Sequence, residues 1–269
     1  MFRRFKEQVK QIGRTIVCEG IRKYEQQSHV DVFNKSEDAI GCFSLTKSLV
    51  HKAKKCAIPK TLDSQMELRS YEFETKEDFL YRCVKHLDRQ SIIFYIDCLP
   101  FFWEYFVLSS DCIRGSEYSM LDIGSRTGAG ANLFGELFFD AMWGSDVKLS
   151  VDVTDLDEQW NSYCMMQPYI NRCMNIDIFD MENGSYDFVF CSHTIEHLDD
   201  PINFIMQATN ISRKFAIFYC PYNETNPPEC HKTIGDDIIS SANPVYIKHI
   251  KSLAYPSCDC VLFICSPMT

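Results

Sequence analysis

The fold of this chain is decided by the stretch Met120-Leu121-Asp122-Ile123-Gly124-Ser125-Arg126-Thr127-Gly128-Ala129-Gly130. Its apolar first part is typical of a buried strand, and an aspartate lies near the end of that strand. The glycines then permit a tight turn in which the backbone can approach a ligand closely. Apolar residues at helical spacing follow, so the stretch predicts a strand, a turn and a helix N-terminus. In α/β sheets this arrangement holds nucleotide-like groups.

The glycine spacing does not fit the dinucleotide-binding loop, whose pattern is G-x-G-x-x-G. Counted from Gly124, the second glycine position is Arg126, and counted from Gly128, the third is Leu133. A NAD(P)-dependent oxidoreductase is therefore the weaker alternative. The sequence also contains no G-x-S-x-G nucleophile elbow and no phosphate-binding P-loop.

Strand-like and helix-like patterns alternate downstream of this stretch, which predicts a Rossmann-like, mostly parallel sheet with helices on both faces. Two further apolar runs, at 244–255 and 259–266, predict a terminal antiparallel strand pair. Asp200-Pro201 predicts a helix start with an N-cap and a proline in the first turn. The expected strands are 119–123, 147–151 ending at Asp152, 174–178, 186–191 and 215–219, and the expected helices are 130–142 and 155–166.

The N-terminal part differs in pattern from the rest. We expect residues 1–110 to be a helical extension and residues 111–269 to be the α/β domain. Residues 76–108 are helical in pattern, and Pro100 is expected to split that helix in two. Residues 1–17 predict a basic amphipathic helix, which would dock on its own domain or lie on an anionic membrane surface.

Composition and charge narrow the class of protein. A hydrophobic share of 46% excludes a disordered chain. Residues 1–60 carry thirteen Lys/Arg and six Asp/Glu, whereas the remainder carries fourteen and thirty-one, so we expect no nucleic-acid groove in the α/β part. Fourteen cysteines in a chain without a secretory leader pattern or a bilayer-spanning run predict reduced thiols and a cytoplasmic location.

Two motifs resemble those of class I S-adenosylmethionine (SAM)-dependent methyltransferases. The first, D-x-G-x-G-x-G, is matched by Asp122, Gly124 and Gly128, with Arg126 in place of the middle glycine. The second is similar to the fourth-strand motif, in which an aspartate starts the strand, a small polar residue ends it, and Glu-His-Leu and Asp-Pro follow; here it spans 185–201. The resemblance covers roughly 115–222 and is closest to methyltransferases that act on small molecules, lipids or sugars.

The resemblance implies SAM as the cofactor and an enzyme that transfers its methyl group. Asp122, Gly124, Ser125, Arg126 and Gly128 would hold the methionine end. Asp152, next to Val153, would accept the ribose hydroxyls, with Asp155 as the register alternative, and the adenine side would meet Asp177, Ile178 and Ser192.

The acceptor would arrive beyond the fourth strand, where His193, Glu196 and His197 lie, and His193 or His197 would act as the base. Because Arg126 departs from the motif, a non-catalytic binding module with the same fold is the alternative to an enzyme.

Some of the histidines and cysteines are spaced as metal ligands could be. The stretch from His193 to His197 fits H-x-x-E-H, which binds zinc when it lies on a helix, but here it follows a β run directly. Cys230-His231, and Cys258-x-Cys260 with Cys265, contain no C-x₂-C pair. We therefore expect no metal site. His231, in the loop after the strand at 215–219, would lie over the active site.

Overall fold

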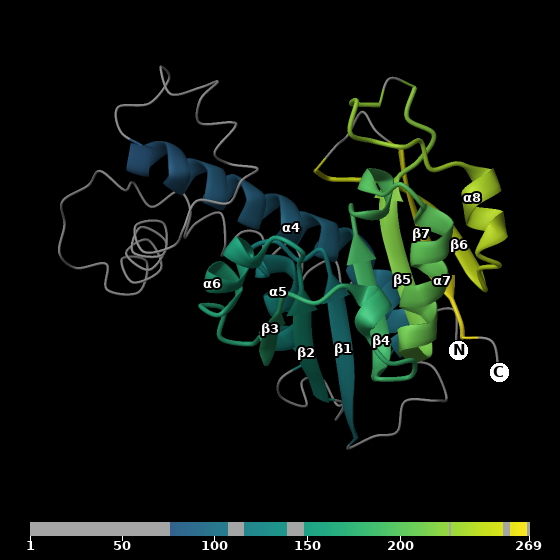
Figure 1. Ribbon diagram of the computed structural model, residues 1–269, viewed down its shortest axis with the longest axis horizontal. Coiled ribbons are helices and arrows are strands. Elements are labelled where there is room, and N and C mark those ends of the chain that lie inside the picture. Colours follow the sequence, from purple (N-terminus) through teal and green to yellow (C-terminus); the bar gives the residue numbers. More distant parts are fainter. Residues whose placement is uncertain (1–75, 107–115, 139–147, 226, 255–258, 268–269) are drawn as a thin grey trace, which may run out of the picture.

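A seven-stranded sheet forms the centre of the molecule (Figure 1). This computed structural model describes residues 76–106, 116–138, 148–225, 227–254 and 259–267, so the prediction for residues 1–17 lies outside the described residues. The strands are β1 (Glu117–Ile123), β2 (Lys148–Thr154), β3 (Arg172–Met174), β4 (Tyr186–Ser192), β5 (Ser212–Pro221), β6 (Tyr246–Lys251) and β7 (Asp259–Cys265). The helices are α4 (Lys76–Phe106), α5 (Ala129–Leu137), α6 (Asn161–Cys164), α7 (Pro201–Ile211) and α8 (Asp236–Ser241), with 3₁₀ turns η3 (Glu158–Trp160), η4 (Ile178–Asp180) and η5 (Ile195–His197).

The strand order is β3-β2-β1-β4-β5-β7-β6. The first five strands are parallel, and β7 runs antiparallel between β5 and β6. This confirms the predicted parallel sheet and the terminal antiparallel pair. The chain builds outward from β1 in one direction and from β4 in the other. Ligands bind in open α/β sheets at such a switch point, beyond the carboxyl ends of the two strands.

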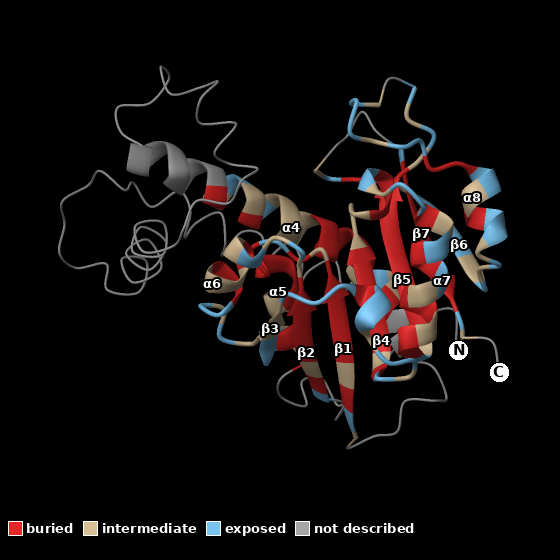
Figure 2. Cartoon of the chain, viewed as in Figure 1, coloured by how far each residue is buried: buried red, intermediate tan, exposed pale blue. Residues whose placement is uncertain are grey.

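Two apolar layers cover the sheet, because successive side chains of a strand point to opposite faces. On one face α4 and α5 pack Tyr95, Phe102 and Phe134 against strand residues such as Phe190. On the other face α7 packs residues such as Ile205 against alternate strand positions. The central strands are accordingly buried along most of their length (Figure 2).

Helix α4 is one continuous helix from Lys76 to Phe106, with Pro100 inside it. The predicted split at Pro100 is therefore wrong. The proline removes one backbone hydrogen bond, but Cys98 before it and Phe102 after it both lie in the core beneath the helix. Since α4 and the sheet share this core, the expected domain boundary at residue 110 separates two elements that pack together.

Three elements differ from the prediction near the expected cofactor site. β2 ends at Thr154, beyond the predicted end, and β3 ends at Met174, where a strand was expected to begin. Asp152 therefore lies inside β2, not at its end. Between these strands, the expected helix at 155–166 is only the η3 turn and the four-residue α6.

The predicted start of α7 is confirmed. The Asp200 side chain accepts a hydrogen bond from the backbone N–H of Asn203 at 3.1 Å, and Pro201 occupies the first turn. Elsewhere, the eight cysteines whose side chains the structure describes are in the reduced thiol form. None of the helices in the described ranges has the length and apolar character needed to cross a membrane.

Candidate active site

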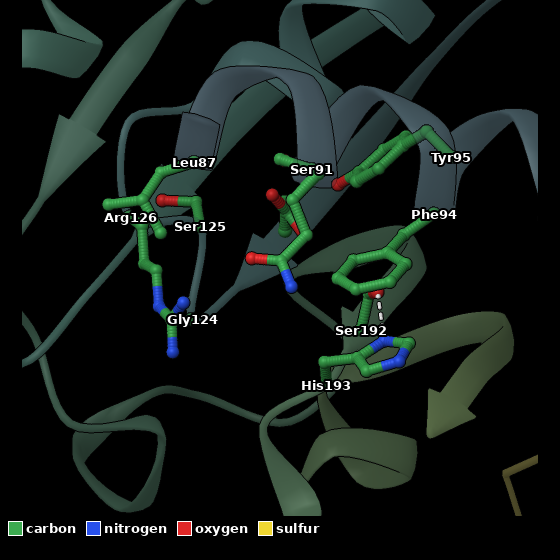
Figure 3. A pocket seen from close by; sticks show the side chains of 11 residues that line it. Leu87, Ser91, Phe94, Tyr95, Gly124, Ser125, Arg126, Ser192 and His193 are labelled. Carbon is green, nitrogen blue, oxygen red and sulfur yellow. Dashed lines mark hydrogen bonds between the residues drawn. The ribbon is translucent and has the colours of Figure 1, made fainter. Parts of the chain in front are cut away.

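A small cavity lies at the switch point of the sheet, between the loops that follow β1 and β4 and beneath α4 (Figure 3). Its volume is about 40 Å³, enough for a few water molecules. Only one end of a ligand the size of a nucleoside could enter it without side-chain movement. The cavity is lined by Leu87, Gln90, Ser91, Phe94 and Tyr95 from α4, by Asp122, Gly124, Ser125 and Arg126 from β1 and its loop, and by Ser192 and His193 after β4.

The loop after β1 has the left-handed backbone that the glycines predicted. Gly124 has φ 74° and Gly128 has φ 72°. Arg126, which replaces the middle glycine of the motif, also has positive φ, at 47°. The Gly124 N–H donates to the carbonyl of Thr154 at 2.9 Å, which fixes the loop to the end of β2. The arginine is thus accommodated in the loop, with its side chain exposed along the open side of the cavity (Figure 3).

Asp122 lines the cavity from β1 and is only 3% exposed. Burial raises the pKa of its carboxyl to about 8; hydrogen bonding by the Tyr95 hydroxyl acts in the opposite direction, and the nearby Asp155 carboxylate adds to the rise. The group is therefore largely neutral at physiological pH in this state of the protein. A cation that entered the cavity would stabilise its ionised form.

Asp155, the register alternative, lies just beyond the end of β2. Its Oδ2 accepts from the backbone N–H of Arg126 at 2.9 Å, and its Oδ1 accepts from that of Asp157 at 3.0 Å. The carboxylate therefore adjoins the glycine loop directly. Burial raises the pKa of Asp155, while these two backbone N–H groups act in the opposite direction.

The carboxylate of Asp152 is occupied elsewhere. It accepts from the Arg172 guanidinium at 2.6 Å, from Asn171 Nδ2 at 2.9 Å and from the Tyr186 hydroxyl at 2.8 Å. Val153, the other residue expected here, is 1% exposed and belongs to the hydrophobic core. These contacts favour Asp155 over Asp152 as the carboxylate that faces a ligand.

Asp152→Ala is expected to weaken the fold, not the site. The substitution leaves the buried Tyr186 hydroxyl and Asn171 amide without their shared acceptor, which costs about 1–3 kcal/mol. Urea denaturation of the variant should show a lower midpoint with an unchanged slope. Ligand affinity measured well below the midpoint should equal that of the wild type, and a selective loss of affinity would contradict this assignment.

The residues after β3, which were expected to face adenine, differ from the prediction in which side chains are exposed. Ile178, which was expected to pack against adenine, is 3% exposed and lies in the core on the α7 side of the sheet. Ile176 is 41% exposed, and its carbonyl accepts from Thr154 Oγ1 at 2.8 Å, beside Asp155. Asp177 is exposed and caps η4 through the N–H of Phe179. Ile176 is thus an exposed apolar residue at this edge of the sheet, and Leu156 and Phe179 in the adjoining segments are exposed as well.

His193 forms the other wall of the cavity. Its ring stacks on Phe94 of α4, with centroids 3.5 Å apart and planes 7° from parallel, and its Nδ1 is 3.2 Å from Ser192 Oγ (Figure 3). Burial lowers the pKa of His193 well below its usual range, and the positive charge of Arg126 lowers it further. The imidazole is therefore neutral at physiological pH.

Glu196 and His197 lie on the η5 turn that follows. Glu196 is 1% exposed, and burial raises the pKa of its carboxyl to about 8. His197 is exposed, and its ring meets that of His231 edge to face at a centroid distance of 4.5 Å. His231 lies on the loop after β5, as predicted. The N–H of the next residue, Lys232, donates to the Glu196 carbonyl at 2.6 Å and holds this loop beside η5. The H-x-x-E-H pattern spans a strand end and one 3₁₀ turn, so it lacks the helix that a zinc hydrolase needs.

The contribution of α4 to the site was missed by the sequence reasoning. Phe94, Tyr95 and Ser91 line the cavity although they precede β1 by more than twenty residues. The Ser91 hydroxyl accepts from the N–H of Gly130 at 3.1 Å, and a Cβ on Gly130 would lie 2.3 Å from the Tyr95 ring. The sequence did contain one sign of this contact. Gly130 lies inside the first turn of α5, where no tight turn requires a glycine, and a glycine in such a position indicates that another element packs closely against it.

Comparison with known families gives one match by sequence. A family model described as a methyltransferase domain matches residues 71–225, a span that includes all of α4, the sheet as far as β5 and both loops of the cavity. Comparison with curated proteins gives no match.

Solved structures show the same fold. The chain is similar to magnesium protoporphyrin IX methyltransferase from Synechocystis PCC 6803 with bound SAH, at 11% identity and a TM-score of 0.50, covering 77% of this chain and 95% of that one. It also resembles a SAM-dependent methyltransferase from Aquifex aeolicus, at 15% identity and a TM-score of 0.47, covering 68% of this chain and 97% of that one.

Proposed function

We propose that this chain transfers a methyl group from SAM to a small-molecule, sugar or lipid acceptor, because it belongs to the methyltransferase-domain family and is a class I SAM-dependent enzyme. The observation that carries this proposal is the buried carboxyl of Asp122, which lines the cavity beside the glycine loop at the switch point of the sheet. A carboxyl in this state fits a ligand that brings a positive charge, as the ammonium group of SAM does.

The residues of the site fit the parts of SAM as follows. The loop from Gly124 to Gly128, with Ser125 and Arg126, would hold the methionine end, and Asp122 would face its ammonium group. Asp155 would accept the ribose hydroxyls, in place of Asp152. Ile176 would pack against adenine in place of Ile178, with Asp177 and Ser192 as its polar neighbours.

When bound, SAM supplies an electrophilic methyl group on a sulfonium centre. The chain's own task is to orient the acceptor in line with that carbon, to exclude water and to remove a proton. We assign proton removal to Nε2 of His193, in the neutral tautomer whose Nδ1–H donates to Ser192 Oγ and leaves Nε2 as the acceptor. Phe94 fixes the plane of this ring by stacking on it. Exposed Arg126 supplies positive charge on the acceptor side, whereas buried Glu196, with its pKa raised to about 8, is largely neutral there.

Arg126→Gly is expected to retain SAM binding and to reduce methyl transfer. Glycine relieves a backbone conformation that costs an L-residue about 1–2 kcal/mol, and the backbone N–H that meets Asp155 remains. The guanidinium is lost, and with it the positive charge that lowers the pKa of His193 and helps to keep its imidazole neutral. Calorimetric titration with S-adenosylhomocysteine (SAH) and a turnover assay check the two halves separately, with Arg126→Lys as the variant that keeps the charge. Binding of SAH to the glycine variant alone would favour a non-catalytic native protein.

The acceptor class is tested with SAM labelled in its methyl group. The purified chain is incubated with labelled SAM and a cell extract separated into small-molecule, lipid, protein and nucleic-acid fractions. We expect label in the small-molecule or lipid fraction, and none when His193 is replaced by Ala. Label recovered in protein or nucleic acid would contradict the proposed acceptor class.

We also propose a cytoplasmic location, which the free thiols of the described cysteines support. Membrane contact through residues 1–17 remains a prediction from the sequence.

A further inference from the structure

Three metal-binding side chains from two loops meet beside the proposed active site. His197 comes from η5, after β4, while Cys230 and His231 come from the loop after β5. One possible ligand atom from each residue lies within 4.8 Å of the other two. Neither the H-x-x-E-H pattern nor the Cys230-His231 pair predicted this group, because each contains only part of it.

The backbone around the cluster is held by hydrogen bonds. The Lys232 N–H donates to the carbonyl of Glu196, and the side-chain ammonium of Lys232 donates to the carbonyl of Asp199. The His231 N–H donates to the carbonyl of Pro228 at 2.8 Å. Lys232 thus fastens the loop that carries Cys230 and His231 to the segment that carries His197.

Glu224 provides an independent feature of a built metal site. Its Oε2 lies 2.9 Å from Nδ1 of His231, and both side chains are only 17% exposed. A carboxylate that accepts from Nδ1 fixes the histidine tautomer and leaves Nε2 as the ligand atom. Carboxylates take this role behind the histidine ligands of many zinc sites.

We propose that His197, Cys230 and His231 bind a zinc-type divalent cation with one coordination position left open. Zinc takes thiolate sulfur at about 2.3 Å and imidazole nitrogen at about 2.0–2.1 Å in a tetrahedral arrangement, so the ligand atoms would approach to about 3.5 Å of one another. Side-chain rotation of the exposed His197 and Cys230 can close the remaining distance. Three protein ligands with an open fourth position characterise catalytic zinc sites, whereas structural sites have four. This site goes beyond the proposed methyl transfer and does not depend on it.

The test is equilibrium dialysis of the full-length, chelator-treated protein against Zn²⁺, with Co²⁺ as a spectroscopic substitute. We expect one zinc per chain and, with Co²⁺, the absorption of a thiolate–metal bond. Cys230→Ser should abolish that absorption, and each of Cys230→Ser, His197→Gln and His231→Gln should weaken zinc binding by roughly 100-fold or more. Glu224→Gln should weaken it about 10–100-fold and leave the thiolate absorption in place.

His249→Gln is the matched control, since His249 is an exposed histidine on β6 that contacts Tyr222 and lies outside the cluster. It should bind zinc as the wild type does. Stoichiometric zinc that is unaffected by the cluster variants would place the ion on other residues and overturn the proposal. Failure of the wild-type protein to bind zinc would overturn it as well. Circular dichroism of each variant verifies that it is folded.

Discussion

Gly124→Ala is expected to destabilise the protein by about 2–5 kcal/mol. Two effects add. The residue has φ 74°, where an alanine is strained, and a Cβ there would lie 2.2 Å from Oγ1 and 3.1 Å from Cβ of Thr194. Thr194 follows β4, so the contact is the point where the two loops of the site touch. Urea or thermal unfolding measures the loss.

Gly184→Ala is the matched control because Gly184 has a similar φ of 66° but open surroundings, with only Arg213 Cγ at 3.7 Å. It should cost about 1–2 kcal/mol, the backbone strain alone. The second substitution Thr194→Ala should recover part of the loss at Gly124 and none at Gly184. Equal losses for the two alanine variants would mean that the loops are not in contact at Gly124.

The Asp122→Asn variant is expected to gain stability relative to the wild-type protein as the pH rises. The carboxyl has a pKa of about 8 in the folded protein and about 3.9 in the unfolded chain. Between these values the folded state holds a proton that the unfolded state has released, so wild-type stability falls as pH rises. Asparagine has no such titration. The difference in unfolding free energy, variant minus wild type, should therefore grow between about pH 5 and 8 by at most ~1.4 kcal/mol per unit and then level off.

The control is Asp187→Asn, at the opposite end of the sheet. Arg213 and Ser119 hold the pKa of Asp187 below its usual value, although burial opposes them. Its stabilising contribution is therefore complete above about pH 5 and is lost only in acid. Unfolding measured from pH 5 to 9 should give a constant difference for Asp187→Asn and a rising one for Asp122→Asn. A flat difference for Asp122→Asn would show that its carboxyl is ionised in the free protein.

The sequence alone predicts the architecture well, because the features that specify it are local. The apolar runs and the turn at Gly124 and Gly128 identify β1 and its loop, and Asp200-Pro201 identifies the start of α7. The antiparallel tail follows from two apolar runs separated by Pro256-Ser257. Pro100 misleads only because tertiary packing on both sides of it outweighs the lost hydrogen bond.

The details of the site depend on where strands end, which local pattern specifies less well. Asp152 and Asp155 both follow an apolar run, so the local pattern does not tell which of the two carboxylates faces a ligand. The hydrogen-bond partners of Asp152 favour Asp155, and two of those partners, Asn171 and Arg172, lie about twenty residues away in the sequence. The proposal that Ile176, not Ile178, packs against adenine has the same origin, since β3 ends at Met174. The meeting of His197 with Cys230 and His231 depends on the pairing of β4 with β5, which brings together two loops that are distant in sequence.

The most direct measurement is calorimetric titration of SAH into the wild type, Asp155→Ala and Asp152→Asn, at a pH and temperature where all three are folded. We expect measurable binding to the wild type and to Asp152→Asn. For Asp155→Ala we expect a loss of affinity of about 10–100-fold, the value of hydrogen bonds to a charged group. Absence of binding to the wild type, or a loss confined to Asp152→Asn, would contradict the assignment of the cofactor site to the edge formed by the glycine loop and Asp155.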